Sequence, residues 1–368
     1  MIRFLLGRAL WRWLERLGEE EPPRPPRVSV EVRPLADAET PTEQPRTGEW
    51  VFPRVQGASM GCLFEIYLAG VDREALEGAA REALEEIERL DRQLSHYRDD
   101  SDIARLNAHA ADQWVRLEPR LYNLLRRCAA LSAATDGAFD ISTLPLLRAW
   151  GFHDGAHRVP SSEEIASLLP LVGMRNLEFD DEERLVRYCA PGVEVALGAV
   201  GKGYAIDEAV TTLRFYRVNR AVIHGGRSTV YAIGAPPDDE AWRFTIKDPR
   251  DHRTPLEEIG LRDAALSTSA ATEQRFEADG VEFGHILDPR TGCPASRCLS
   301  VSVVAPSAEL SDALSTAFYV GGPELAERYT REHPEVRAIL VLPSDRGVDV
   351  RRYGGQAAHA DRAQDGVL

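Results

Sequence analysis

The sequence lacks three features that would each have indicated a specific class of protein. Its five cysteines are scattered and odd in number and form no CxxC pair, which fits neither a disulfide framework nor a cysteine zinc site. No run of eighteen apolar residues occurs, so we expect no membrane span. Basic residues number 44 against 59 acidic ones, which argues against a general nucleic-acid binder because the phosphate backbone would be repelled.

The first residues carry an unusual pattern. Residues 1–18 interleave arginines with apolar residues at helical spacing, namely Leu6, Leu10, Trp13 and Leu17. This spacing predicts a basic amphipathic helix, which can lie on an anionic membrane surface or dock on a partner. Packing of the helix on its own domain is the alternative.

The chain divides by composition into a tether, a folded body and a tail. Residues 19–48 hold seven prolines and many charges, which is typical of an extended or disordered linker. With 43% apolar residues overall, we expect a folded body of sizeable core over residues 49–345. A polar tail is expected over residues 346–368.

The body mixes helical and strand patterns without a strict βαβ alternation. Apolar residues step by three and four through residues 76–94 and 119–134, which predicts amphipathic helices. Short apolar runs predict strands, among them residues 60–69 and 193–197. We therefore predict an α+β fold, with helices packed on an antiparallel or mixed sheet, rather than a doubly wound parallel fold.

Residues 283–294, FGHILDPRTGCP, concentrate reactive groups on a predicted turn. His285, Asp288, Arg290 and Thr291 bring an imidazole, a carboxylate, a cation and a hydroxyl together just before Gly292. An apolar run that ends in such groups suits a loop at the mouth of a site. The alternative is an ordinary strand exit in which Asp288 and Thr291 bond their own backbone.

A second segment, SDALST, is expected to open a helix that starts at Ser307 and stops at Gly321-Gly322. Asp312 and Thr316 are four residues apart, so their oxygens lie on one face of the helix. A carboxylate plus a hydroxyl suits Mg²⁺, which keeps waters and binds phosphate oxygens of its substrate. An exposed helix face, on which Asp312 is favourable near the N-terminus, is the alternative.

Residues 195–204, VALGAVGKGY, place Lys202 among glycines before a predicted helix. The segment fails the P-loop pattern, because Ala196 stands where the first glycine belongs and Gly203 follows the lysine. Small residues, a cation and free helical N–H groups still suit a phosphate. A plain strand–turn–helix connection is the alternative.

Two more segments offer polar groups at predicted turns. Asp140 ends TDGAFD, where it could bond N–H groups of a ligand or cap the next turn. Residues 265–272 gather hydroxyls at a strand end, where they could bond a phosphate or cap the neighbouring backbone.

The blocks MG, SHYR, SDIARLN, GAFD, LGAVGKGYAID, HGG, LSTS, HILDPRTGCP and SDALSTA occur in an order that closely resembles the FAD:protein FMN transferase family, the ApbE-like flavinyltransferases. The resemblance covers about residues 52–342. It implies an ApbE-like, T-fold-like body that transfers FMN from FAD to a threonine hydroxyl of an acceptor protein, using Mg²⁺ and releasing AMP.

The resemblance also implies residue roles. His285 matches the position of a base, and Asp288 is a candidate to orient its imidazole. The metal would be held by the carbonyl of Ala199 together with Asp312 and Thr316. The residues implied to line the FAD are Met60, Tyr97, Ala138, Phe139, Asp140, Lys202 and Ile286.

Three positions depart from the family pattern by losing or changing a polar group. They are Ala196, Arg227 after HGG, and Ala270 after Thr268-Ser269. Arg227 is a candidate phosphate contact.

Two alternatives to transfer are an FAD pyrophosphatase, in which water replaces threonine, and a non-catalytic FAD-binding protein. Many family members are exported and lipid-anchored, but no lipobox cysteine stands near Met1, so that location is not carried over. The basic helix and the Pro-rich tether would instead suit a body held near a membrane from the cytoplasmic side.

Overall fold

A computed structural model describes residues 49–226, 228–270, 274–345 and 347–355. The expected helix and tether at residues 1–48, together with Arg227 and Thr272, lie outside the described residues. Across the part of the chain that is described, no helix has the length and apolar character needed to cross a membrane.

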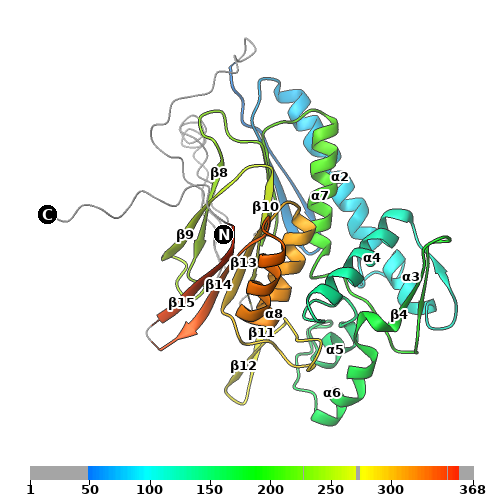
Figure 1. Cartoon of the computed structure of the whole chain (residues 1–368). Coiled ribbons are helices and arrows are strands. Elements are labelled where there is room, and N and C mark those ends of the chain that lie inside the picture. The colour runs from blue at the N-terminus through cyan, green and yellow to red at the C-terminus, as the bar shows by residue number, and fades with distance from the viewer. Residues whose placement is uncertain (1–48, 227, 271–273, 346, 356–368) are drawn as a thin grey trace.

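An eight-stranded antiparallel sheet forms the centre of the body (Figure 1), which confirms the predicted fold class. Its order is β1 (Arg54–Ser59), β2 (Cys62–Leu68), β6 (Ala221–Gly225), β7 (Thr229–Ile233), β10 (Ala264–Ala270), β13 (Ser300–Ala305), β14 (Arg337–Ser344) and β15 (Gly347–Gly354). The boundary expected at residue 345 is wrong, because β15 pairs with β14 along its whole length and forms the edge of the sheet.

Residues along each strand alternate between two apolar layers, as the period of a strand requires. In β6, Ile223 faces the larger core, whereas Val222 faces a second one. The larger core lies under three helices, which are α2 (Arg73–Leu94), α7 (Gly201–Phe215) and α8 (Ala308–Glu332). The second core lies under a hairpin of β8 (Trp242–Lys247) and β9 (Pro255–Leu261).

Helix α8 is interrupted where the sequence predicts its end. Ser307 caps the start, with its hydroxyl accepting a hydrogen bond from the N–H of Leu310. Gly322 adopts φ 74° and ψ −163° ahead of Pro323, a conformation that only glycine takes without strain. The predicted stop is therefore confirmed, and a second helical segment continues to Glu332.

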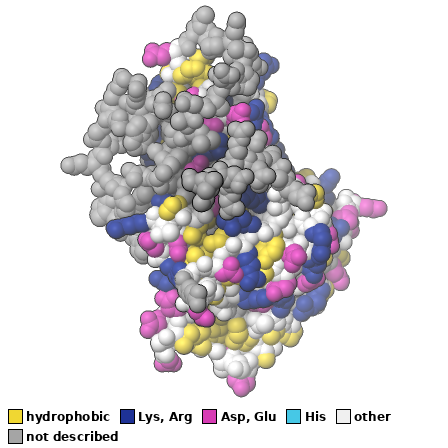
Figure 2. All heavy atoms as spheres, turned by 60° about the vertical axis from the view of Figure 1, so that its left-hand side comes forward, with side chains coloured by type: hydrophobic (Ala, Val, Ile, Leu, Met, Phe, Trp, Pro, Cys, Tyr) yellow, Lys and Arg dark blue, Asp and Glu magenta, His cyan; other side chains and the backbone are white. Residues whose placement is uncertain are grey.

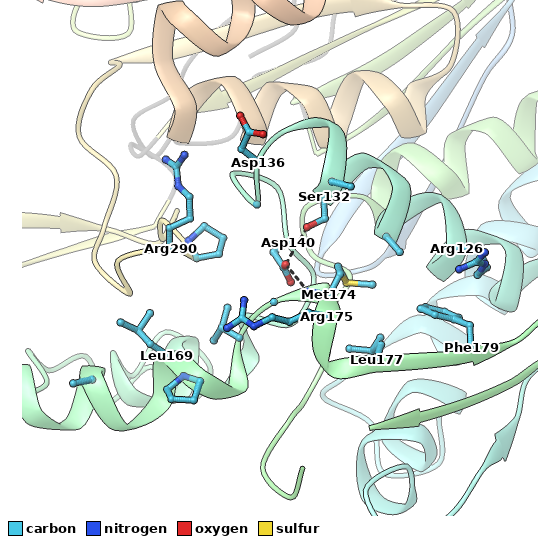
Figure 3. Close-up of a pocket in the computed structure, with 18 residues that line it drawn as sticks. Arg126, Ser132, Asp136, Asp140, Leu169, Met174, Arg175, Leu177, Phe179 and Arg290 are labelled. Atoms are coloured by element: carbon cyan, nitrogen blue, oxygen red, sulfur yellow. Dashed lines mark hydrogen bonds between the residues drawn. The ribbon is translucent and has the colours of Figure 1, made fainter. Parts of the chain in front are cut away.

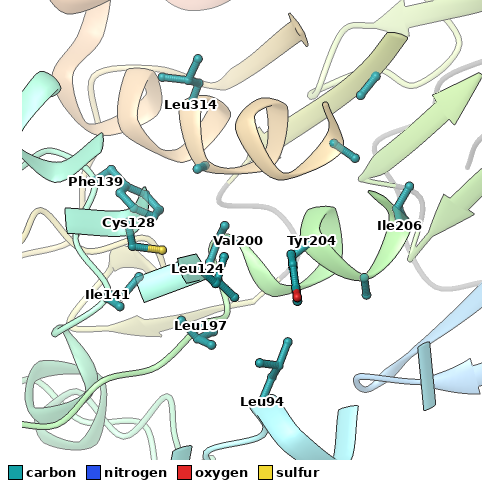
Figure 4. Close-up of a cluster of buried hydrophobic side chains, with 14 of the residues drawn as sticks. Leu94, Leu124, Cys128, Phe139, Ile141, Leu197, Val200, Tyr204, Ile206 and Leu314 are labelled. Atoms are coloured by element: carbon teal, nitrogen blue, oxygen red, sulfur yellow. The ribbon is translucent and has the colours of Figure 1, made fainter. Parts of the chain in front are cut away.

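A smaller helical region adjoins the sheet (Figure 1). It contains α3 (Asp102–His109), α4 (Pro119–Ala134), α5 (Leu144–Ala149), α6 (Ser162–Leu168), the short helices η1 (Leu169–Leu171) and η2 (Met174–Asn176), and the strands β3 (Val115–Arg116), β4 (Leu177–Asp180) and β5 (Leu185–Tyr188). Figure 4 shows its side chains from α4 meeting those of α7 and α8 in one apolar cluster.

The strand expected at residues 193–197 is absent from this region. The amide of Asn107 instead donates to the carbonyl of Val195 (2.9 Å) and accepts from its N–H (2.9 Å). One side chain thus makes the two hydrogen bonds that a neighbouring strand would have made, and the next N–H, that of Ala196, donates to the carbonyl of Ile141 (2.7 Å).

Charged side chains of both signs are intermixed on the face shown in Figure 2. Glu257 of β9 illustrates what they do, because it accepts hydrogen bonds from Arg337 of β14 and from Arg352 of β15 (2.7 Å). The ion pairs join the hairpin to the edge of the sheet.

Candidate active site

The helices α7 and α8 approach each other most closely at Gly203. A Cβ atom there would lie 2.2 Å from the carbonyl oxygen of Ala308 and 2.8 Å from the Cα of Glu309. Both are backbone atoms, which cannot rotate away as a side chain would. The glycine after Lys202 is therefore explained by packing, and this packing brings the first turns of the two helices together.

Each helix supplies a carboxylate to the N-terminus of the other. Asp207 of α7 accepts hydrogen bonds from the N–H groups of Ala308 and Glu309 (both 2.8 Å). Asp312 of α8 accepts from the N–H of Gly203 (3.1 Å). Free N–H groups at a helix N-terminus favour negative charge, so the exchange stabilises both helices.

Asp312 is buried, at 5% exposure, so the exposed helix face considered as the alternative is wrong. Its second oxygen accepts from the hydroxyl of Thr229 in β7 (3.2 Å). Burial raises the pKa of Asp312, whereas Lys202, the Gly203 N–H and the Thr229 hydroxyl lower it, and the net shift is upward. The carboxylate is thus held in one orientation at a site where more positive charge would stabilise its ionised form.

Thr316 lies one turn further along the same face of α8. Its hydroxyl is 3.2 Å from that of Ser269 in β10, and Ser269 also bonds Ser315 (2.7 Å). Because β7 and β10 are neighbours, Asp312 and Thr316 face adjoining strands. Nearby in β10, the hydroxyl of Ser267 is buried without a hydrogen bond, directly opposite Thr229.

These groups fit a small hard cation. Asp312 and Thr316 offer oxygen atoms, which Mg²⁺ prefers, and the buried carboxylate would gain from an added positive charge. The carbonyl of Ala199 precedes the first turn of α7, the turn that Asp312 caps. The described residues contain no cluster of three or more His, Cys, Asp or Glu side chains that could hold a metal ion.

Lys202 connects this pair to the imidazole. Its positive charge lowers the pKa of Asp312 and also that of His285. A charge acts measurably only over short distances in a protein. Three residues from α7, α8 and the segment after β12 therefore share one electrostatic environment, although they are separated by up to 110 positions in the sequence.

His285 is held by backbone, not by a carboxylate. It follows the hairpin of β11 (Arg275–Ala278) and β12 (Val281–Gly284), and its Nδ1 lies 3.1 Å from the carbonyl oxygen of Gln274. A carbonyl only accepts, so we assign the proton to Nδ1, which leaves Nε2 with a free lone pair. Burial and Lys202 lower the pKa of the ring, although the Gln274 bond opposes them. The imidazole is therefore neutral near pH 7 and suited to accept a proton.

Asp288 does not orient that imidazole. Its carboxylate accepts hydrogen bonds from the N–H of Arg290 (2.9 Å) and from the guanidinium of the same residue (both 2.8 Å). The structure gives it no bond to His285 among the described residues. The alternative of a turn that bonds its own backbone is the correct one, because Arg290 is two positions away and the loop closes locally.

The turn itself is fixed against the helical region. The N–H of Gly292 donates to the carbonyl of Asp288 (2.8 Å), and its own carbonyl accepts from the indole of Trp150 (2.8 Å). Gly292 has φ 73°, and a Cβ there would lie 2.6 Å from Ile165. Trp150 also contacts the ring of Phe283 (5.3 Å). The residues that flank His285 on both sides are thus anchored to α5 and α6.

The other residues implied to line FAD have different environments. Phe139 is 1% exposed and packs in the main core (Figure 4), so its ring is not available for stacking on a flavin. Asp140 spends its oxygens on Ser132, Ser142 and Met174 within 3.1 Å, which is the capping alternative.

Four residues implied to line FAD remain. Tyr97 is 64% exposed and stacks on His153, with 4.8 Å between the ring centroids. Met60 lies at the turn between β1 and β2 with φ 50°. Ala138 and Ile286 are buried. Of the predicted site residues, Asp312 and Thr316 thus share one face of α8, and Lys202 acts through its charge on both Asp312 and His285.

Sequence reasoning missed the groups that support the site. Gln274 acts through its backbone carbonyl, which no side-chain pattern reveals. Thr229 and Ser269 are ordinary strand residues until the sheet places them beside α8. Asp207 lies in the KGYAID block, six residues after Gly201. A carboxylate at that position could have suggested a cap for the N-terminus of another helix.

Comparison with known proteins identifies the family of the chain. A family model described as the ApbE family matches residues 60–340. The chain is 29% identical over 286 residues to the FAD:protein FMN transferase of Klebsiella pneumoniae (strain 342), covering 76% of this chain and 81% of the relative. It is 32% identical over 283 residues to the FAD:protein FMN transferase of Treponema pallidum (strain Nichols), covering 72% and 78%.

Solved structures show the same likeness. The ApbE protein of Thermotoga maritima MSB8 superposes with a TM-score of 0.74 and 31% identity, covering 82% of this chain and 97% of the other. The apo form of the flavinyl transferase ApbE from Pseudomonas stutzeri gives a TM-score of 0.72 and 29% identity, covering 84% and 96%.

Proposed function

Because the chain belongs to the ApbE family, we propose that it is an FAD:protein FMN transferase whose acceptor is a threonine hydroxyl of another protein. The observation that carries this proposal is the buried carboxylate of Asp312 at the first turn of α7, beside Lys202, whose charge also acts on His285. A base, a phosphate-binding cation and a cation-binding carboxylate are the three functions that cleavage of a pyrophosphate by a hydroxyl needs.

The reaction forms one bond and breaks one. The threonine oxygen attacks the phosphorus of the FMN half of FAD, and the bond from that phosphorus to the bridging oxygen breaks, so that AMP leaves. The hydroxyl proton goes to Nε2 of His285, the nitrogen that the Gln274 carbonyl leaves unprotonated. Because burial and Lys202 keep the ring neutral, it can accept that proton at physiological pH.

Lys202 and the first turn of α7 would hold the phosphates. Negative charge gathers on the phosphoryl oxygens during transfer, and a fixed ammonium group stabilises it. Lys202 stands at the second position of α7, where the helix N-terminus also favours an anion. The carboxylate of Asp312 beside it would repel a phosphate, so a further cation between them is needed.

Mg²⁺ is that cation in our proposal. Asp312, Thr316 and the carbonyl of Ala199 would hold it, and it would neutralise phosphate oxygens of FAD. The buried Asp312 carboxylate, whose pKa is raised by burial, supports this assignment on grounds independent of the reaction.

Two measurements test the function. Purified protein is incubated with FAD, MgCl₂ and a threonine-containing acceptor peptide and assayed for AMP, and total protein from cells that express the chain is searched by mass spectrometry for FMN-modified threonine. We expect both products, a loss of about 100-fold in His285→Gln, and no change in His109→Gln, which alters an exposed histidine of α3. AMP with free FMN and no adduct would assign the chain as a pyrophosphatase instead. Absence of AMP would favour a non-catalytic FAD-binding protein.

A further inference from the structure

A long surface hollow lies beside the turn that carries His285. Its volume is about 960 Å³, and it runs between the end of α4, the segment from α6 to β4, and Pro289 and Arg290 of the turn. Figure 3 shows Arg290 and Leu169 at one end, Arg126 and Phe179 at the other, and Arg175 between them. A smaller hollow of about 350 Å³ continues it and shares Asp136 and Arg290.

The hollow does not belong to the phosphate site. None of Lys202, His285, Asp312 and Thr316 lines either part of it. It nevertheless touches the same turn as His285. Cα atoms five residues apart lie at most about 18 Å from one another, so a polypeptide segment of roughly six residues can reach from the Nε2 of His285 to Arg290.

The position of that turn is fixed. The N–H of Asp288 donates to the carbonyl of Cys293 (2.8 Å), the Gly292 N–H donates to the Asp288 carbonyl, and Trp150 holds the Gly292 carbonyl. A ligand seated against Arg290 therefore has a set distance to His285. This is the property that a docking groove for a protein substrate requires.

The lining is rich in arginine, in a chain of net charge −15. The two hollows together contain five arginines and three carboxylates, namely Arg126, Arg175, Arg290, Arg297, Arg328, Asp136, Asp140 and Glu324. Four of the arginines are ion-paired, Arg126 with Asp181, Arg290 with Asp288, Arg297 with Glu324 and Arg328 with Asp136. The Asp140 carboxylate is fully used by internal hydrogen bonds. Among the described residues, Arg175 is the one arginine of the five with no carboxylate in ion-pair contact, so its guanidinium is the group that a carboxylate of a ligand would meet.

Apolar surface lies between the arginines. Leu169, Met174, Leu177 and Phe179 line the floor, and the guanidinium of Arg126 lies over the ring of Phe179 at 4.9 Å. A floor of this kind with cations along it fits an extended polypeptide that buries alternate side chains and presents carboxylates.

We propose that this hollow, the arginine groove, binds the segment of the acceptor protein that flanks the modified threonine, and that the segment carries acidic residues. The inference rests on the proposed function, since it names the binding surface for that reaction's second substrate. The arginines attract carboxylates of this segment, whereas the net negative charge of the rest of the protein would repel them.

The test uses three synthetic twelve-residue peptides with one central threonine, flanked respectively by Asp and Glu, by Asn and Gln, or by Lys. Binding to the full chain is followed by fluorescence anisotropy, and modification by mass spectrometry after addition of FAD and MgCl₂. We expect the acidic peptide to bind about tenfold more tightly than the neutral one. Arg175→Glu should remove this preference and favour the Lys peptide. Arg262→Glu, which alters an exposed arginine in the β9–β10 turn, is the matched control and should change nothing.

Binding of FAD in the absence of peptide separates the two proposals. If Arg175→Glu keeps FAD binding and weakens only peptide binding, the groove is supported. If the three peptides bind alike, or if Arg262→Glu weakens binding as much as Arg175→Glu, the groove is not the acceptor site. If binding depends on Arg175 but no threonine is ever modified, the groove stands and FMN transfer is contradicted.

Discussion

Helices α7 and α8 begin side by side, and their first turns are completed in opposite ways. The start of α8 is closed by side chains, because Ser307 accepts from Leu310 and Asp207 accepts from Ala308 and Glu309. The start of α7 has no side-chain cap from its own N-cap residue, Val200. It receives a single carboxylate, Asp312, from the other helix, and its first N–H, that of Gly201, donates to the carbonyl of Leu197 (2.7 Å).

The difference separates a structural helix start from a functional one. The first turn of α7 combines small residues, the ammonium group of Lys202 and a buried carboxylate whose pKa is raised. Such a turn can receive a phosphate with its counter-ion. Replacing each of the two carboxylates by an amide, one at a time, tests this contrast.

The largest expected effect is that of Asp312→Asn. Asparagine keeps the shape and one acceptor oxygen, but it removes the charge that would hold Mg²⁺. We expect transfer to fall about 1,000-fold, measured as AMP release at saturating FAD, with the fold retained. The same change at the closed helix start, Asp207→Asn, should reduce transfer less than about threefold. Equal losses in both variants would show that the two helix starts do not differ in function.

The next effect concerns the contact that brings the two starts together. In Gly203→Ala the new Cβ would lie 2.2 Å from the Ala308 carbonyl, so the helices must separate. We expect a loss of about 3 kcal/mol of unfolding free energy, with weakened FAD binding, measured by urea unfolding and FAD titration. Gly78→Ala is the control, since a Cβ on that helical glycine of α2 meets nothing within 4 Å. It should stabilise the fold by up to about 1 kcal/mol. A stable Gly203→Ala variant would mean that the helices can shift freely.

The sequence could predict only the part of this contrast that depends on contacts between residues close together in the chain. The Ser307 cap and the stop at Gly322 are local and follow from the residues beside them. The same holds for the bond from Arg290 to Asp288, which local turn chemistry predicts and the family resemblance did not. Asp207 and Ala308 are 101 residues apart, and only the packing of two helices at Gly203 brings them together.

Burial could not be predicted for the same reason. Asp312 sits in a helix whose pattern allowed either an exposed or an inward face, and β7 decides the outcome through Thr229. Phe139 looked like a ring suited to stacking, yet α4, α7 and α8 enclose it. The eighth strand, β15, reads as a polar tail because one edge of the sheet is open to solvent, where polar residues belong.

A smaller effect follows from the closed helix start. Burial raises the pKa of Asp207 to about 6, although the two backbone N–H groups oppose it. The folded protein therefore holds this proton more tightly than the unfolded chain, whose value is about 4. The stability from this group is complete below about pH 4 and is lost as pH rises through about 6. The unfolding free energy of the wild type relative to Asp207→Asn should decline by about 2 kcal/mol between these limits. A rise would mean that the N–H bonds outweigh burial.

The smallest effect sharpens the role of Lys202 at the open helix start. Its charge lowers the pKa of His285, after burial, which is the larger cause. Activity on the acidic side falls as the imidazole is protonated, so the midpoint of the acidic limb of kcat/KM for the acceptor reports that pKa. In Lys202→Met the charge is gone and burial is retained. The midpoint should then move to higher pH. This shift is separate from any overall loss of rate that weaker FAD binding causes. In Lys247→Met, which removes a cation from β8 under the opposite face of the sheet, the midpoint should stay where it is. If both variants keep the wild-type midpoint, the lysine and the imidazole do not share a site, and the open start of α7 is not where the chemistry takes place.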